Sequence, residues 1–151
     1  MAESQDPALS GREFVEAIVD GREPQPPMLD TLSIRIIEVA DGQVVLEGRP
    51  GPQHFHGGEI VHGGYALTMI DAATGAVANM LRPADGRIGT IETKVNLIKA
   101  ITASTGPVRA TGSVVSASRR LVVAEARLVA LNGDLLAYGT STLLLTLPSN
   151  T

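Results

Sequence analysis

A glycine pair and an aspartate at the start of one helical pattern are the residues best suited to chemistry. Gly63 and Gly64 follow His62, and Asp71 lies two turns further along. The first N–H groups of a helix lack internal partners and carry the positive end of its dipole, so glycine amides there can bind an oxyanion. Asp71 stands among apolar residues, where a carboxylate is costly unless it is paired or used. The pattern fits an acyl-transfer site with Gly63 or Gly64 as oxyanion hole and Asp71 as general base or nucleophile.

Two other interpretations compete with an acyl-transfer site. In the first, the glycines form only a tight strand-to-helix turn and Asp71 is a hydrogen-bonded helix residue. On a glycine pair and one aspartate alone, this structural explanation is the stronger. The second is a metal site, because His54, His56 and His62 flank Glu59, and imidazole and carboxylate are common metal ligands. A metal site is disfavoured because the residues after His62 are helical and the chain has no other histidine.

The helix that carries the candidate residues is predicted to run from about Gly63 to Leu81. Its apolar stripe has helical spacing and comprises Ala66, Met69, Ile70, Ala73, Val77 and Met80. Its other positions are unusually small, and a glycine such as Gly75 in mid-helix costs about 1 kcal/mol relative to alanine. We therefore expect a helix that is wrapped on most sides and packs closely at Gly75.

The remaining elements are predicted from local signals. Ser10 to Glu13 fits a capping box that opens a short amphipathic helix, and prolines between residues 24 and 27 indicate a linker. Asp41-Gly42 predicts a hairpin between two alternating strands. From Arg87 to Leu147, apolar residues recur at every second position in four longer runs. Together these elements predict an α+β fold in which a curved six-stranded antiparallel sheet wraps around one long central helix.

Length and composition limit the class of protein. A chain of 151 residues with 44% hydrophobic residues suits a single domain, residues 1–151, with residues 1–28 as N-terminal helix and proline-rich lead-in. Cysteine is absent, which excludes disulfides and thiolate chemistry. We expect a cytoplasmic protein with no membrane or nucleic-acid partner, because no apolar run approaches a membrane span and the net charge is −4. Residues 82–127 nevertheless hold eight of the twelve Lys and Arg residues, which suits a small polyanionic ligand.

A later strand motif adds specificity to the glycine turn. The strand Thr90-Ile91-Glu92-Thr93-Lys94-Val95-Asn96-Leu97-Ile98-Lys99 follows the Val-His-Gly-Gly turn and its aspartate. Together these residues resemble the hotdog-fold acyl-CoA thioesterases of the phenylacetate-pathway and 4-hydroxybenzoyl-CoA thioesterase type, over roughly residues 29–147. The resemblance implies hydrolysis of an acyl-CoA thioester without a metal or other cofactor. It also implies homodimers whose sheets join edge to edge, often paired again into homotetramers.

The resemblance assigns roles to single residues. It implies that Gly63 polarises the thioester carbonyl, that His62 shapes the turn with Gly64, and that Asp71 activates water or attacks the carbonyl. The residues that it implies for substrate binding, the last three of them near the CoA phosphates, are His56, Thr74, Lys99, Arg119 and Arg120. The chain departs from the family at His56, where Asn or Gln is common. The acyl group is not specified by the sequence, and a non-hydrolytic acyl-CoA-binding sensor on the same fold is the alternative function.

Distance along the helix adds a constraint that is independent of the family. Eight residues at a rise of 1.5 Å place the Cα atoms of Gly63 and Asp71 ~12 Å apart. Reacting groups must converge to roughly 3–3.5 Å, so one chain does not readily supply both. A twofold dimer with antiparallel helices would set Gly63 of one subunit against Asp71 of the other and give two equivalent sites.

Overall fold

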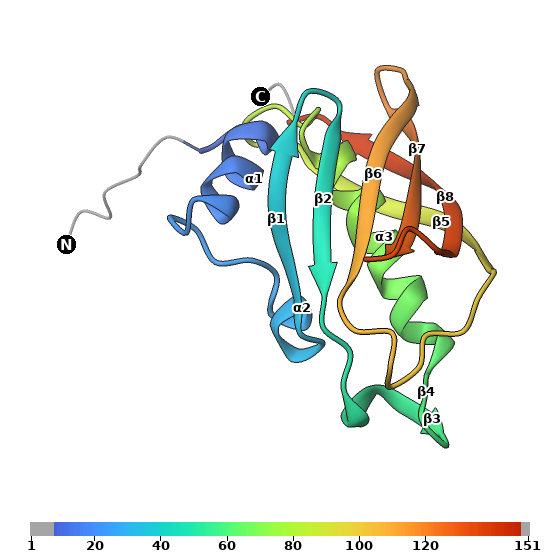
Figure 1. Cartoon of the computed structure of the whole chain (residues 1–151). Coiled ribbons are helices and arrows are strands. Elements are labelled where there is room, and N and C mark those ends of the chain that lie inside the picture. Colours follow the sequence, from blue (N-terminus) through green and yellow to red (C-terminus); the bar gives the residue numbers. More distant parts are fainter. Residues whose placement is uncertain (1–7, 149–151) are drawn as a thin grey trace.

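The computed structural model describes residues 8–148 and centres on one helix, α3 (Gly63–Asn79), that lies against a six-stranded antiparallel sheet (Figure 1). The strands follow the order β1-β2-β6-β7-β8-β5. Their bounds are β1 Ile34–Ala40, β2 Gln43–Gly48, β5 Arg87–Leu97, β6 Val108–Ala117, β7 Leu121–Ala130 and β8 Leu135–Thr146. The predicted α+β fold with a sheet around a central helix is confirmed. None of the helices within residues 8–148 is long and apolar enough to cross a membrane.

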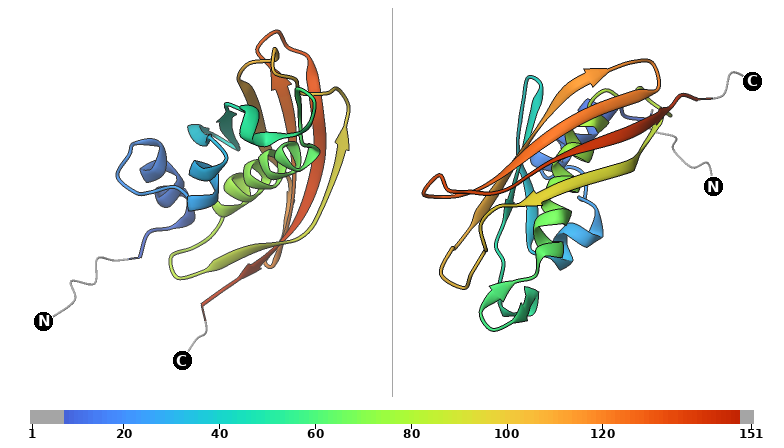
Figure 2. Two further views of the ribbon diagram at one scale, coloured as in Figure 1. Left: turned by 90° about the horizontal axis from the view of Figure 1, so that it is seen from below. Right: turned by 90° about the vertical axis from the view of Figure 1, so that its right-hand side faces the viewer.

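Two short helices precede the sheet. Helix α1 (Gly11–Val19) begins with the predicted capping box, in which the Ser10 hydroxyl accepts from the Glu13 N–H and the Glu13 carboxylate accepts from the Ser10 N–H. Helix α2 (Pro27–Thr31) occupies part of the predicted linker. Proline favours the first helical position because its fixed φ suits a helix and its missing N–H would be unpaired there. Both helices lie on the side of α3 that the sheet leaves uncovered (Figure 2, left).

Helix α3 packs directly against glycines of the sheet, two of which lie against residues close to Asp71 in sequence. A Cβ atom at Gly112 on β6 would overlap the Ala73 carbonyl oxygen, and one at Gly139 on β8 would press on Ile70. By contrast, a Cβ atom at Gly75 would meet nothing within 4 Å. Within the chain, the expected close packing therefore occurs on the sheet side of α3 and not at Gly75.

One face of α3 and the neighbouring edge strand β5 are open to solvent. Leu67 is 44% exposed, and Asp71 on the next turn of the same face is also exposed, so the helix is less fully wrapped than expected. On β5, Ile91 and Leu97 are 62% and 56% exposed. The register of β5 against β8 shifts between Thr90 and Glu92. This bulge breaks the predicted strict alternation of inward and outward residues, because an extra residue moves every later side chain to the opposite face of the sheet.

The buried phenol of Tyr65 allows a prediction on stability. Its hydroxyl makes no well-formed hydrogen bond within residues 8–148. Burial raises its pKa to about 12, and the backbone N–H of Arg49 nearby opposes part of this rise. This pKa lies above the unfolded value of about 10. The part of the free energy of unfolding that depends on a neutral Tyr65 is therefore fully present below pH 10 and is lost as pH rises toward 12. We expect Tyr65→Phe to keep or raise the free energy of unfolding at pH 7 and to weaken its decline between pH 10 and 12.

Urea unfolding of both proteins at pH 7, 10 and 11 measures this effect. Removing an unpaired buried hydroxyl loses no hydrogen bond. A loss of more than about 1 kcal/mol at pH 7 would show that the hydroxyl has a stabilising partner.

Candidate active site

The glycine turn is held by a small hairpin below the main sheet. A 3-10 turn (Pro52–His54) leads into β3 (Phe55–Gly57) and β4 (Ile60–Val61), which pair with each other. The Val61 N–H donates to the Ile101 carbonyl, and the His62 N–H donates to the His54 carbonyl, both at 2.8 Å. The first bond attaches the start of α3 to the loop between β5 and β6, and the second attaches it to the 3-10 turn, so the glycine turn has a defined orientation.

The two glycine amides differ in availability. The Gly64 N–H donates to His62 Nδ1 at 2.9 Å, so His62 caps α3 with its own side chain. The Gly63 N–H has no acceptor among residues 8–148, and Gly63 lines a pocket. An unpaired N–H at the first position of a helix can bind an oxyanion. The geometry thus favours Gly63 over Gly64 as the amide that could bind a substrate oxygen.

Loss of the His62 cap should be measurable in both stability and turnover. We expect His62→Ala to lower the free energy of unfolding by about 1 kcal/mol, because the Gly64 N–H loses its acceptor. The same change should lower kcat, since the neighbouring Gly63 amide would lose its fixed direction. Asparagine is a strong capping residue, so His62→Asn should restore most of the stability and more of kcat than alanine does. Equal stability of the alanine variant and the native chain would contradict the capping role.

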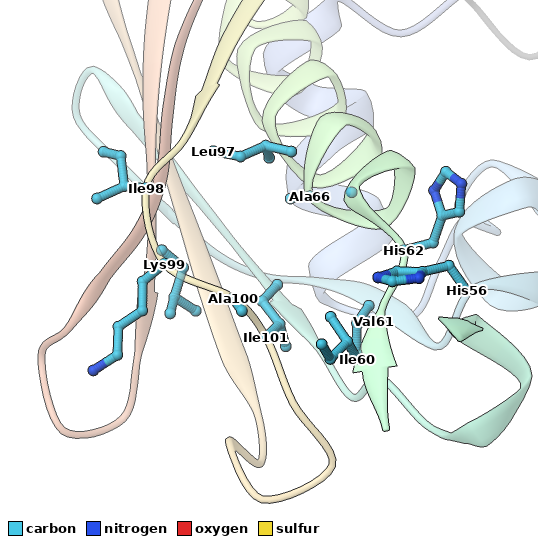
Figure 3. A pocket seen from close by; sticks show the side chains of 12 residues that line it. His56, Ile60, Val61, His62, Ala66, Leu97, Ile98, Lys99, Ala100 and Ile101 are labelled. Atoms are coloured by element: carbon cyan, nitrogen blue, oxygen red, sulfur yellow. The ribbon is translucent and has the colours of Figure 1, made fainter. Parts of the chain in front are cut away.

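A pocket of about 280 Å³ lies beside the glycine turn. Figure 3 shows His56 and His62 together on one side of it and Lys99 on the other. The two imidazole rings meet edge to face with centroids 6.1 Å apart. The rest of the lining is mainly apolar and comprises Ile60, Val61, Ala66, Leu97, Ile98, Ala100, Ile101 and Leu136, with Gly63. Such a lining suits the uncharged part of a ligand, whereas the polar side chains of the pocket suit the polar groups of that ligand.

Lys99 is paired in this structure. Its ammonium donates to the Asp134 carboxylate, and this hydrogen bond lowers the pKa of Asp134. Both side chains are substantially exposed, and an exposed ion pair of this kind contributes little stability. A phosphate could therefore compete with Asp134 for Lys99 at low cost.

Asp71 is held by hydroxyl groups. Thr90 and Thr93 on β5 both donate to its Oδ1, at 2.9 and 3.3 Å. Thr93 also bonds to Ser141 at 2.9 Å, and Ser141 bonds to the buried hydroxyl of Thr74 at 2.8 Å. Thr74 thus lies beneath Asp71 in the core, where it joins α3 to the sheet. The Asp71 Oδ2 has no partner within residues 8–148 and is available to a water molecule or a substrate.

The two threonines that bond to Asp71 were not predicted from the sequence. Thr90 and Thr93 are three residues apart, so a regular strand would place them on opposite faces. The bulge between Thr90 and Glu92 brings both to the helix side. Both threonines belong to the strand motif from Thr90 to Lys99, which could have pointed to them. The alternation of apolar residues alone, however, does not reveal a bulge.

The structure separates Asp71 from the glycine turn. Asp71 does not line the pocket that holds Gly63, His62 and Lys99. It lines two other hollows, one between α3 and the N-terminal helices and one beside β5. Within one chain, the amide and the carboxylate therefore face different spaces.

The predicted phosphate-binding residues are also separated within the chain. Arg119 and Arg120 form the turn between β6 and β7, where the Arg120 carbonyl accepts from the Leu145 N–H. The Lys99 N–H instead bonds to the Leu136 carbonyl, near the other end of β8. Nine strand residues at about 3.3 Å each put these two ends about 30 Å apart. One ligand could meet both groups only if they came from different subunits.

The histidines do not form a metal-binding cluster. Within the described chain, no group of three or more His, Cys, Asp or Glu side chains is placed to hold a metal ion. His54 is buried, and its Nδ1 accepts from the Gly51 N–H at 3.0 Å. It therefore shapes the loop before β3 and does not face the pocket that His56 and His62 line.

Fold and site together define a hotdog-fold protein with a glycine turn at the start of its central helix and a solvent-facing aspartate two turns along the same helix. The chain belongs to the thioesterase superfamily, whose family model matches residues 58–137. This range contains the glycine turn, Asp71 and all of β5. The protein is therefore a thioester hydrolase at the level of the family. No curated protein matches the chain.

Solved structures with the same fold include proteins from several bacteria. A thioesterase family protein from Silicibacter pomeroyi is 26% identical, with a TM-score of 0.78 over 89% of this chain and 99% of that one. A phenylacetic acid degradation-related protein from Ralstonia eutropha is 19% identical, with a TM-score of 0.79 over 87% and 98%. A mutant of the phenylacetic acid degradation protein PaaI from Thermus thermophilus is 23% identical, with a TM-score of 0.70 over 79% and 98%.

Proposed function

We propose that the protein hydrolyses acyl-CoA thioesters at two equivalent sites, each shared between the subunits of a homodimer. The observation that carries the proposal is that Gly63 and Asp71 lie on one helix but open into different hollows. Their separation of ~12 Å along the helix is too large for both to reach one carbonyl group. An antiparallel second copy of α3 removes this difficulty, because it offers its own Gly63 to Asp71.

The exposed apolar residues support the proposed dimer. Strand β5 is an edge of the sheet, and Ile91 and Leu97 lie largely exposed on it. Leu67 is exposed on the same face of α3 as Asp71. Unpaired edge strands with exposed apolar side chains are natural places for strand addition. Pairing of β5 with its copy would cover these residues and bring the two helices together.

Hydrolysis at each proposed site has two steps, which are general-base attack by water and then breakage of the C–S bond. Asp71 Oδ2 accepts a proton from water, and the water oxygen attacks the thioester carbonyl carbon. The Gly63 N–H of the other subunit stabilises the negative charge that develops on the carbonyl oxygen. The C–S bond then breaks, and the thiolate of CoA leaves and takes up the proton that Asp71 received from water, so that the products are the free acid and CoA and Asp71 is a carboxylate again.

Release of free thiol from a panel of acyl- and aryl-CoA esters tests the proposed activity. Turnover of at least one ester class is the expected result. Tight binding of these esters without thiol release would instead support the sensor function.

Sharing of the site is tested with a mixed dimer that carries Asp71→Ala in one differently tagged subunit. It should retain about half of the native activity, because one of its two sites keeps both groups.

We place the CoA phosphates at Lys99 of one subunit and at Arg119 and Arg120 of the other. Lys99→Ala and the double variant Arg119→Ala/Arg120→Ala should each raise KM for CoA esters about three- to tenfold, because each removes charge-assisted hydrogen bonds to phosphate. The value of kcat should change little, since these groups lie away from the reacting carbonyl. Arg22→Ala, which removes an exposed arginine beyond α1, is the control. An unchanged KM in both variants would reject these positions.

A further inference from the structure

We propose that the groove between α3 and the N-terminal helices binds the acyl chain of the substrate, and that this chain is a medium-length alkyl group. The inference rests on the proposed function. The groove has a volume of about 300 Å³, and Asp71 contributes to its wall. An acyl group attached to a carbonyl beside Asp71 would therefore enter it directly.

The lining has the chemistry of an alkyl site. Among the described residues that form the groove, Asp71 is the only one that carries a charge, and none is aromatic. The opposite wall is aliphatic and comprises Val15, Pro26, Met28, Leu29 and Ile36. Burial of each methylene in such surroundings strengthens binding about fourfold. The absence of a ring among these groove residues offers an aryl group no stacking partner.

Small residues on α3 keep the groove open. Ala72, next to Asp71, and Gly75 and Ala76, about one turn beyond it, line the groove. A Cβ atom at Gly75 would lie in open space, so a larger side chain there would project into the groove without a clash. A glycine in mid-helix is a poor helix former, and an open binding groove gives a reason for its presence.

The length of the groove limits the length of the chain. The residues of α3 that line it run from Thr68 to Asn79, and Asp71 lies near the Thr68 end. Asp71 and Asn79 are ~12 Å apart along the helix. An extended chain gains about 1.2 Å per bond, as a peptide backbone of three bonds per residue does. The groove therefore accepts about eight to ten carbons.

The wall opposite α3 comes from a part of the chain outside the family match. Val15, Pro26, Met28 and Leu29 belong to α1, α2 and the segment between them. The family model begins at residue 58. The choice of acyl group thus depends on a segment that the family model does not match, whereas the proposed catalytic residues lie in the matched part.

Two variants and a series of saturated acyl-CoA esters test the groove. In the native protein, kcat/KM should rise from acetyl-CoA to octanoyl-CoA and level off beyond decanoyl-CoA. Gly75→Met should lower kcat/KM for octanoyl-CoA about tenfold or more and change that for acetyl-CoA less than about threefold, because it fills the groove. Methionine is a better helix former than glycine, so the variant should fold. Met28→Ala, which shortens the opposite wall, should also reduce the preference for octanoyl-CoA.

The control is Ala40→Met, which adds the same side chain at an exposed position of β1 and should leave the chain-length profile unchanged. Equal effects of Gly75→Met on all chain lengths, or no effect on any, would overturn the acyl groove while leaving the proposed hydrolysis intact. Conversion of Gly75→Met to a monomer in size-exclusion chromatography would show that the groove is a subunit contact, and would also overturn it. Absence of thiol release from every ester by the native protein would instead reject the proposed function itself.

Discussion

Asp71→Asn is expected to lower kcat for thioester hydrolysis by about 10²- to 10⁴-fold, the usual contribution of a positioned general base. Asparagine has nearly the same shape as aspartate and keeps an oxygen that can accept from Thr90 and Thr93. It cannot take a proton from water. The variant should therefore fold and bind substrate as the native protein does, and lose only the chemical step.

Steady-state thiol release measures kcat, and thermal unfolding and size-exclusion chromatography check that fold and assembly are unchanged. KM should stay within about threefold, since a lost transition-state interaction acts on kcat. Retention of native kcat by Asp71→Asn would remove Asp71 from the reaction. A matched variant, Asp41→Asn in the β1–β2 turn, should leave kcat unchanged, because Asp41 lines neither the Gly63 pocket nor the hollows at Asp71 and its exposed carboxylate bonds to Arg12.

Gly63→Pro should lower kcat by about 10²- to 10³-fold, because it removes one N–H donor from the proposed oxyanion hole. Proline suits this position in the fold. Gly63 is the first residue of α3, where proline is favoured. His62 has φ −56° and ψ 135°, an extended conformation that a following proline requires. The substitution therefore removes the hydrogen-bond donor and keeps the helix.

Gly63→Ala is the matched control, because it adds a Cβ atom but retains the N–H. In either variant the new Cβ atom would lie 2.7 Å from Leu97 Cδ1, the end of an exposed and flexible side chain that can move aside. Similar kcat values for the proline and alanine variants would show that the amide has no catalytic role. Mixing the inactive Asp71→Asn and Gly63→Pro proteins should restore activity, since each mixed dimer contains one intact site. No recovery on mixing would reject sharing of the site.

Much of the fold could be predicted because its signals are local. The capping box at Ser10, the Asp41-Gly42 hairpin and the start of α3 at Gly63 all appear as predicted. Each depends on hydrogen bonds or dihedral angles within a few residues, so the sequence contains the whole cause. The candidate catalytic groups were found for the same reason, since helix N-terminal amides and an acid on the same helix are local features.

The features that could not be predicted depend on contacts between distant segments. The partners of Asp71 come from β5, and a bulge decides that both Thr90 and Thr93 reach it. The openness of α3 around Leu67 arises because no other segment within residues 8–148 covers that face. The separation of Lys99 from the arginine pair within one chain could not be predicted either, because it follows from the path of β8, which places them at opposite ends of the sheet.

The two glycines beneath α3 have a consequence for mutational tolerance. Gly112 and Gly139 touch no proposed substrate, yet any side chain there would push the helix away from the sheet at Ala73 and Ile70. Both neighbours flank Asp71 in sequence, so such a shift would move the carboxylate. A saturation library selected for activity should therefore show these two positions nearly as depleted of substitutions as Asp71 itself, while Gly75 accepts larger residues at the expense of long substrates.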